Sequence, residues 1–513
     1  MNAPIDSTQP LRLRNAEAAP LDSLPIAELH EFLNWVKNSV QNGSRLLSLF
    51  TLAPQHAVTK NNNPDKLGSP STLVAALADD YTGRIMLMGT MVEGSYPALT
   101  PDIPQAHIFE RLLFEEEGIL PHGHPWLKPV RFSRTDGPNV GIMDFFRVDG
   151  QEVHEVAVGP VHAGVIECGH FRFQCLGEEV MHLEISLGYH HRGLDTLLTG
   201  GPNKRTLPLM EIIAGDSTIA HTWAACSVLE ALMDASVSPQ GQIIRSLALE
   251  LERLANHTGD LGALSMDAGF LPTASYCGRL RGDWLNTTAL LCGNRFGRGL
   301  VRPGGTLFSL DHDLASTIRR RFHEISRDVN GAVNLLWHSS SFIARVSDIG
   351  TITPRNAHDL GLVGVAARAC ALPLDSRHTH PLPGLPLPPE PCAEKYGDVH
   401  ARALMRQKEI KASVVYCQRL FDVFLNDNTE EYLHQPSQSP APNSLAVAMV
   451  EGWRGEVFHI GVTDENGQFS RYRVTDPSVH NWMGLALALR GQQISDFPLC
   501  NKSFNLSYCG HDL

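Results

Sequence analysis

The sequence predicts an α+β fold, in which a small N-terminal α+β domain precedes a larger, mainly helical domain with peripheral β hairpins. Two observations favour this class. Between residues 71 and 118 the chain reads as strand, turn and strand, followed by a helix that Gly118 ends. Residues 244–255 and 410–424 are long helical stretches with one apolar stripe each, which is typical of helix bundles.

The remaining segments set the expected domain limits. Residues 1–24 are polar and contain proline, so we expect a flexible tail. The α+β domain is expected over 25–140 and the helical domain over 150–513, on either side of a turn-rich joint. Residues 372–393 are rich in proline and are expected to form an extended insertion, with His378 and His380 in a solvated loop.

Composition and charge exclude several classes of function. The net charge of −13 argues against nucleic acid as a partner. No run approaches the roughly 18 apolar residues of a membrane span, and the N-terminus does not resemble a secretion signal. No two of the ten cysteines are spaced as Cys-x-x-Cys, so we expect free thiols, no iron–sulfur cluster and no metal site in this chain.

One stretch concentrates ionisable side chains beside a predicted hairpin. Residues 159–173 read GPVHAGVIECGHFRF, and residues 182–187 then alternate between polar and apolar, as a half-buried strand does. Glycine-rich turns bring such side chains close to a ligand or partner, which makes His162, Glu167 and His170 candidate site residues. A plain surface loop explains the same residues equally well.

This stretch and the segment LGYHHRG at 187–193 resemble the start of one superfamily. Its members are the large subunits of nickel–iron hydrogenases and of formate hydrogenlyase, and the D-type subunit of respiratory complex I. The resemblance covers most of the chain and implies a hydrogenase-large-subunit-like helical domain. Residues 109–111 and 118–129 are similar to the closing motif of the C-type subunit of complex I, so we interpret the chain as a fusion of a C-like and a D-like domain.

The resemblance also tests for a metal centre. Nickel–iron hydrogenases hold their metal pair with four cysteine thiolates, soft ligands that hydroxyl and amide oxygens do not replace. Aligned on Gly215 and His221, the resemblance places four residues without sulfur at these positions: Ala214, Ser217, Asn505 and Tyr508. Cys509 is one residue out of register, a rotation of roughly 100° on a helix. An active hydrogenase is therefore the least favoured function, and the chain resembles energy-converting hydrogenase-related subunits that lack the metal ligands.

In complex I the corresponding cavity binds the quinone headgroup. The resemblance implies that eight residues line it here: His162, Glu167, His170, Asp216, Ser217, His221, Asn505 and Tyr508. Glu167, His170 and His221 are the candidate catalytic residues, because histidine titrates near neutral pH and burial can raise a carboxyl pKa toward it. Asn505 and Ser217 stand where complex I has an aspartate and a tyrosine. The alternative is that these groups only form hydrogen bonds with one another and with the buried backbone, and have no role in catalysis.

A third stretch indicates partners. Residues 293–305 contain five glycines and three arginines, Arg295, Arg298 and Arg302, and in the superfamily this region packs near a small cluster-bearing subunit. The resemblance thus implies that an iron–sulfur cluster lies in a partner similar to the B-type subunit of complex I, together with antiporter-like membrane subunits. No Gly-x-Gly-x-x-Gly motif opens a helix after a strand, so direct NAD binding is not expected.

The leading interpretation is a peripheral-arm subunit of a membrane-bound, complex I-related redox complex. It would lie on the cytoplasmic side of the bacterial inner membrane and couple electron transfer, with quinone as a possible acceptor, to ion translocation. The alternative from another class is a non-catalytic scaffold and coupling subunit with an empty cavity.

Overall fold

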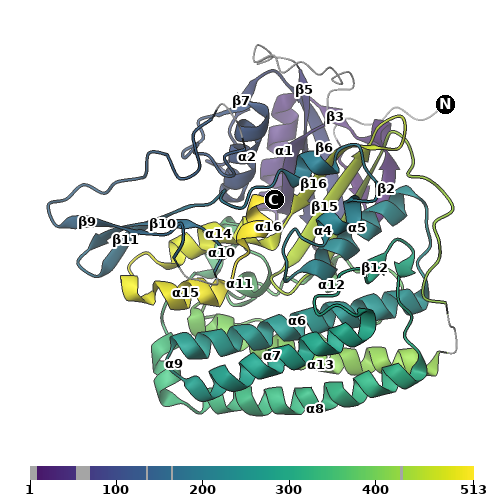
Figure 1. Ribbon diagram of the computed structural model, residues 1–513. Coiled ribbons are helices and arrows are strands. Elements are labelled where there is room, and N and C mark those ends of the chain that lie inside the picture. Colours follow the sequence, from purple (N-terminus) through teal and green to yellow (C-terminus); the bar gives the residue numbers. More distant parts are fainter. Residues whose placement is uncertain (1–8, 53–69, 134–136, 163–165, 428–430) are drawn as a thin grey trace.

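The computed structural model describes residues 9–52, 70–133, 137–162, 166–427 and 431–513, and it has the predicted mixed α+β fold (Figure 1). The N-terminal part is built on an antiparallel sheet in the order β1-β6-β5-β4, to which β3 adds a parallel pairing with β6. The strands are β1 (Leu11–Leu13), β3 (Ile26–Ala27), β4 (Arg45–Thr51), β5 (Ser71–Asp79) and β6 (Arg84–Val92). Helices α1 (Leu29–Gln41) and α2 (His107–Glu117) pack against this sheet. Gly118 ends α2 in the left-handed conformation, as predicted.

A second sheet joins the two ends of the chain. Its order is β16-β15-β14-β2, and its strands are β2 (Glu17–Pro20), β14 (Ser444–Glu451), β15 (Glu456–Thr463) and β16 (Phe469–Thr475). The expectation of a flexible tail is therefore wrong for residues 9–24, because β1 and β2 both lie there. Residues 1–8 are outside the described part. Strand β2 covers an edge of β14 that would otherwise expose unpaired backbone groups.

The helical body consists of long helices that run alongside one another (Figure 1). They are α6 (Pro239–Asp267), α7 (Leu271–Cys292), α8 (His312–Trp337) and α13 (Val399–Asn426). The predicted apolar stripe of α6 is buried, including Ile244, Leu247, Leu251 and Leu254. Shorter helices surround the body: α3 (Leu194–Leu198), α4 (Thr206–Met210), α9 (Ser340–Val346), α10 (Pro354–Asp359), α11 (Gly364–Arg368) and α14 (Pro477–Ala488).

A three-stranded antiparallel sheet projects from one side of the molecule (Figure 1). It consists of β9 (Val153–Val158), β10 (His170–Leu176) and β11 (Glu179–Ser186), which fits the predicted hairpin beside the ionisable stretch. Two short pairs complete the strands, β7 (Ser95–Pro97) with β8 (Leu120–His122) and β12 (Val301–Arg302) with β13 (Gly305–Thr306).

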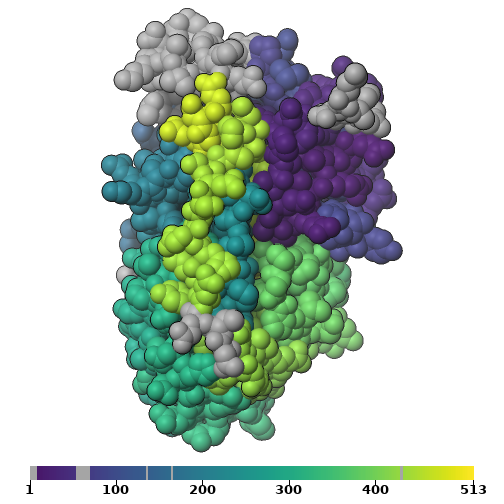
Figure 2. Space-filling view, turned by 90° about the vertical axis from the view of Figure 1, so that its right-hand side faces the viewer, coloured from purple at the N-terminus to yellow at the C-terminus, as the bar shows by residue number. Residues whose placement is uncertain are grey.

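The N-terminal part and the C-terminal sheet share one hydrophobic cluster. Leu47, Phe50 and Val74 of the first sheet pack with Phe458 and Ile460 of the second. Figure 2 shows the consequence, since the purple N-terminal atoms lie directly against the yellow-green C-terminal ones. Among the described residues, no helix combines the length and the apolar content that crossing a bilayer requires.

Candidate functional site

The start of helix α5 (Thr218–Leu232) forms one wall of the candidate site. Ala214 and Ser217 are buried just before it, where the backbone N–H of Ser217 donates to the carbonyl of Ala214 at 2.9 Å. The carbonyl of Asp216 accepts hydrogen bonds from Asn256 Nδ2 at 2.9 Å and from Trp453 Nε1 at 2.8 Å. These bonds fix the backbone and leave the carboxylate of Asp216 to interact elsewhere.

The carboxylate of Asp216 is held by Arg454, which lies in the turn between β14 and β15. Its Nη1 and Nη2 donate to the two carboxylate oxygens at 2.6 and 2.7 Å, an arrangement that matches the guanidinium fork. Nη1 also lies 3.4 Å from Ser217 Oγ, and Nε donates to the carbonyl of Asn505 at 2.5 Å. One buried cation thus joins the start of α5 to the C-terminal segment.

The C-terminal segment consists of α15 (Phe497–Phe504) and α16 (Tyr508–Asp512). Asn505 ends α15 in the left-handed region at φ +46°, a conformation that asparagine tolerates better than most residues. Its Nδ2 donates to Asp260 Oδ1 at 2.6 Å, and Asp260 is in turn paired with Arg406 at 2.7 Å. Asn505 is therefore fixed at both its side chain and its carbonyl.

The glycine-rich loop contacts the next turn of the C-terminal segment. Glu167 Oε2 accepts hydrogen bonds from the backbone N–H groups of Tyr508 at 3.0 Å and Cys509 at 3.3 Å, and the thiol of Cys509 donates to Oε1. The hydroxyl of Tyr508 lies 3.4 Å from His162 Nε2. Gly169 is required here, because a Cβ at this position would lie 2.5 Å from the ring of Tyr508.

Burial changes the protonation of this cluster. It raises the pKa of Tyr508 well above its ordinary value, and it lowers that of His162. Burial, together with the hydrogen bond to Glu167, raises the pKa of Cys509 to about 12. At neutral pH the tyrosine and the thiol are therefore protonated and the imidazole is neutral, so this cluster can both donate and accept protons.

His221 belongs to a separate buried chain of polar groups. Its Nε2 lies 3.0 Å from Asp476 Oδ2 and its Nδ1 lies 3.1 Å from His459 Nε2. His459 Nδ1 lies 2.9 Å from the hydroxyl of Tyr472. Burial and the neighbouring His221 lower the pKa of His459. Burial alone would raise the pKa of Asp476, but the hydrogen bond and charge of His221 outweigh burial, so the pKa of Asp476 is lowered. Of these four groups, only His221 was predicted from the sequence.

The predicted cavity residues thus fall into three groups. Asp216, Ser217 and Asn505 contact Arg454, and the carbonyl of Ala214 bonds the N–H of Ser217. His162, Glu167 and Tyr508 form the loop cluster, and His221 lies in the buried chain. His170 joins none of them, because it opens β10, packs against the ring of Phe145 at 5.2 Å and accepts a hydrogen bond from Arg172 Nε at 3.2 Å. Arg454 itself was missed, and the turn Gly-Trp-Arg-Gly between two predicted strands was its only signal.

Glu252 is a second residue that sequence reasoning passed over. It is buried on α6, and its carboxylate accepts hydrogen bonds from the N–H groups of Ile219 at 2.8 Å and Ala220 at 3.4 Å, in the first turn of α5. Burial, together with the charge of Asp216, raises the pKa of Glu252 to about 8, even though the two N–H groups oppose the shift.

The arginine-rich stretch lies next to the start of α5. Arg302 Nη1 is 3.4 Å from Glu211 Oε1, and the N–H of Gly299 donates to the same oxygen at 2.8 Å. Arg295 and Arg298 are exposed. Of the three arginines predicted to contact a partner, Arg302 is paired within the protein, and the other two have exposed side chains.

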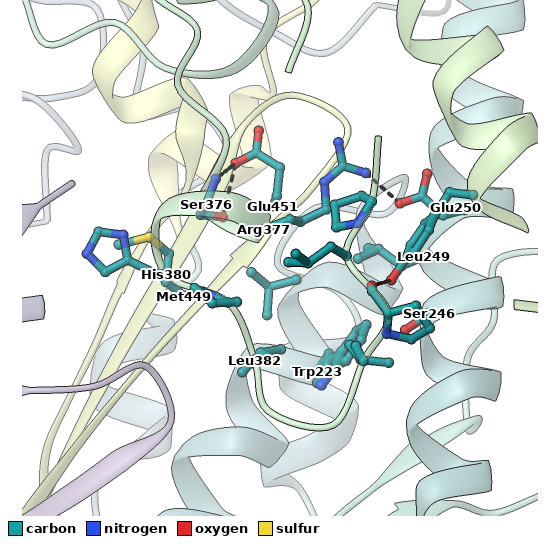
Figure 3. A pocket seen from close by; sticks show the side chains of 17 residues that line it. Trp223, Ser246, Leu249, Glu250, Ser376, Arg377, His380, Leu382, Met449 and Glu451 are labelled. Atoms are coloured by element: carbon teal, nitrogen blue, oxygen red, sulfur yellow. Dashed lines mark hydrogen bonds and ion pairs between the residues drawn. The ribbon is translucent and has the colours of Figure 1, made fainter. Parts of the chain in front are cut away.

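A separate small hollow lies between the helical body and the proline-rich segment (Figure 3). Its charged groups are paired within the protein: Arg377 binds Glu250 at 2.8 Å, and Ser376 donates to Glu451 at 3.1 Å. The expectation of a solvated loop is wrong here, since residues 376–379 form helix α12 and His380 is 1% exposed. The ion pair of Arg377 and the packing of the prolines draw this segment into the core.

Comparisons with known proteins show which proteins the chain is similar to. A family model described as "Respiratory-chain NADH dehydrogenase, 49 Kd subunit" matches residues 267–440. Formate hydrogenlyase subunit 5 of Escherichia coli (strain K12) is 29% identical over 437 residues, 80% of this chain and 76% of that protein. NADH-quinone oxidoreductase subunit 4 of Thermus thermophilus is 26% identical over 373 residues, 67% of this chain and 90% of that protein.

A solved structure agrees in fold. A chain of the membrane-bound sulfane sulfur reductase, an archaeal respiratory membrane complex, superposes with a TM-score of 0.66 at 22% identity, covering 72% of this chain and all of that one. The fold and the sequence comparisons agree that the chain resembles hydrogenase-like large subunits. It is similar both to the 49 kDa subunit of complex I, over residues 267–440, and to the hydrogenase-type subunit of formate hydrogenlyase.

Replacing Arg454 with methionine should destabilise the protein by about 1–3 kcal/mol. The change leaves the carboxylate of Asp216 and the carbonyl of Asn505 unpaired, and the partial exposure of Asp216 limits the loss. Urea unfolding measures the effect, with the exposed Arg298→Met as a control expected to change little. Adding Asp216→Asn to Arg454→Met should recover part of the stability; strictly additive losses would contradict the pairing.

The raised pKa of Glu252 predicts a pH dependence of stability. Between about pH 4.5 and pH 8 the folded state holds a proton on Glu252 that the unfolded state has released, so the free energy of unfolding falls as pH rises. The expected slope from this residue is about 1 kcal/mol per pH unit or less. In Glu252→Gln this part of the slope should vanish, whereas the exposed Glu324→Gln keeps it. Equal slopes in all three proteins would refute the assignment.

Proposed function

We propose that this chain is a peripheral subunit of a membrane-bound redox complex related to complex I and to energy-converting hydrogenases. Its relatives by sequence include a formate hydrogenlyase subunit and a NADH-quinone oxidoreductase subunit, and its relative by fold is part of a respiratory membrane complex. In this proposal the chain lies on the cytoplasmic side of the bacterial inner membrane and contacts a small subunit that holds an iron–sulfur cluster. Arg295 and Arg298 are the residues proposed to face that subunit.

The observation that carries the proposal is the nature of the groups at the former thiolate positions. Ala214, Ser217, Asn505 and Tyr508 bear no sulfur, and Arg454 joins the two segments to which they belong. The hydroxyl of Ser217, the carbonyl of Asn505 and the guanidinium of Arg454 do not fit a nickel–iron pair, because that pair requires soft thiolate ligands. The proposed chemistry of this site is therefore proton handling, with quinone as the proposed acceptor, and hydrogen turnover is not part of it.

Two sets of residues are suited to moving protons. The chain from Asp476 through His221 and His459 to Tyr472 has consecutive contacts of 2.9–3.1 Å, so a proton can pass along it without bulk water. The hydroxyl of Tyr508 can donate a proton at the loop, which is what a quinone carbonyl needs when it is reduced, and the neighbouring imidazole of His162 can exchange protons with that hydroxyl.

Metal analysis of the intact complex tests the proposal. When the complex is isolated from membranes in mild detergent, it should contain this chain with a cluster-bearing small subunit and membrane subunits, and well under one nickel per chain. It should not evolve hydrogen from reduced methyl viologen. Stoichiometric nickel with hydrogen evolution would overturn the proposal, and so would a chain that is fully active without partners.

A non-catalytic scaffold is the second candidate, favoured by the mutual pairing of Arg454 with Asp216 and of Asn505 with Asp260. His221→Gln separates the two. If the buried chain moves protons, the variant complex should assemble normally and lose about 10²-fold in turnover. The exposed His338→Gln is the matched control and should keep full activity. Unchanged turnover in His221→Gln, with assembly intact, would favour the scaffold.

A further inference from the structure

A cluster of three metal-ligating side chains lies beside the loop, one residue beyond the Tyr508 position. Its members are Glu167, His190 and Cys509, and one ligand atom from each lies within 4.8 Å of the other two. They come from three segments far apart in the sequence: the glycine-rich loop before β10, the turn between β11 and α3, and α16. All three are half-buried, so an ion from solvent can reach them.

We propose that Glu167, His190 and Cys509 bind one zinc ion. A carboxylate, an imidazole and a thiolate are the donor types that zinc takes in proteins, whereas calcium and magnesium prefer oxygen ligands throughout. Zinc sites with three protein ligands keep their fourth position for water. The charges balance, because one carboxylate and one thiolate neutralise the two positive charges of the ion.

The backbone around the three side chains is already fixed. The second oxygen of Glu167 accepts the N–H groups of Tyr508 and Cys509, which leaves Oε1 facing the sulfur. The N–H of His190 donates to Asp512 Oδ2 at 2.9 Å, and the carbonyl of Cys509 accepts from Arg192 Nη2 at 3.2 Å. Such outer hydrogen bonds orient the ligands of protein metal sites.

Binding exchanges one proton for the ion. The thiol of Cys509 now donates to Glu167 Oε1; when zinc binds, the S–H bond breaks, a Zn–S bond forms and the proton leaves to solvent. Nε2 of His190 accepts the N–H of Cys168 at 2.9 Å. That bond leaves the proton of the neutral ring on Nδ1, so the ion binds through Nε2 and replaces the hydrogen bond from Cys168.

None of the three ligands occupies a position at which the family resemblance places a nickel ligand, although Cys509 directly follows one of them, Tyr508. The spacing of the cysteines could not predict this site, because only one cysteine contributes to it and the fold brings the other two ligands to that cysteine. A bound ion would tie the loop at 166–168 and the turn at 190 to the C-terminal helix, and so would hold Tyr508 in place beside His162.

Zinc titration of the full chain tests the proposal. The chelator-treated, reduced chain is titrated with zinc alone in competition with a chromogenic chelator, and we expect one tight equivalent. Cys509→Ser, His190→Asn and Glu167→Gln should each weaken that equivalent by about tenfold or more. Cys392→Ser removes another half-buried thiol, outside the cluster, and should leave the affinity unchanged.

Cobalt gives an independent readout. The cobalt-loaded chain should show an intense thiolate-to-cobalt charge-transfer band in the near ultraviolet, which Cys509→Ser abolishes and Cys168→Ser retains. Far-ultraviolet circular dichroism in chelator checks that each variant is folded; should Cys509→Ser be unfolded, Glu167→Gln and His190→Asn carry the zinc comparison. No stoichiometric zinc binding, or a zinc affinity that the folded ligand variants leave unchanged, would overturn the proposal.

Discussion

The guanidinium group of Arg454 joins the two segments from which the candidate site is built. It reaches Asp216 and Ser217 at the start of α5 and the carbonyl of Asn505 at the end of α15, from a turn between two strands of the C-terminal sheet. A planar cation with donors in fixed directions suits this position, because it can bond several oxygens at once without a change of protonation state. The ring of Trp453 lies 3.9 Å from it and completes its surroundings.

This arrangement separates the polar groups into distinct units. Asp216 is paired with Arg454 and Asn505 with Asp260, so the main role of Asp216 and Asn505 is to hold the structure together. The chain through His221 and the loop cluster around Tyr508 remain as the groups that can change protonation. Since buried polar groups are costly unless they are paired, each unit is closed by hydrogen bonds of its own. Paired polar groups are therefore found at Ser217 and Asn505, two of the positions at which the sequence resemblance places thiolates.

The sequence predicted much of the fold and less of the site. The strands between 71 and 92, the helix ended by Gly118 and the apolar stripe of α6 all follow local periodicity, and the structure contains each of them. The expectation of a flexible tail is wrong for residues 9–24, and the expectation of a solvated loop is wrong for His380. In both cases distant partners decide: β14 pairs with β2, and Glu250 pairs with Arg377.

What the sequence determined by itself is the absence of sulfur at four positions, the family resemblance and the local elements, because each depends on residue identity or on neighbours within a few turns. Only the tertiary structure decided which residues meet. Contacts between segments far apart in the chain bring Arg454, His459, Asp476 and Glu252 next to predicted site residues, and leave His170 apart from them. The physical reason is that burial and pairing are properties of the packed chain, and the pKa of a carboxyl or an imidazole depends on both.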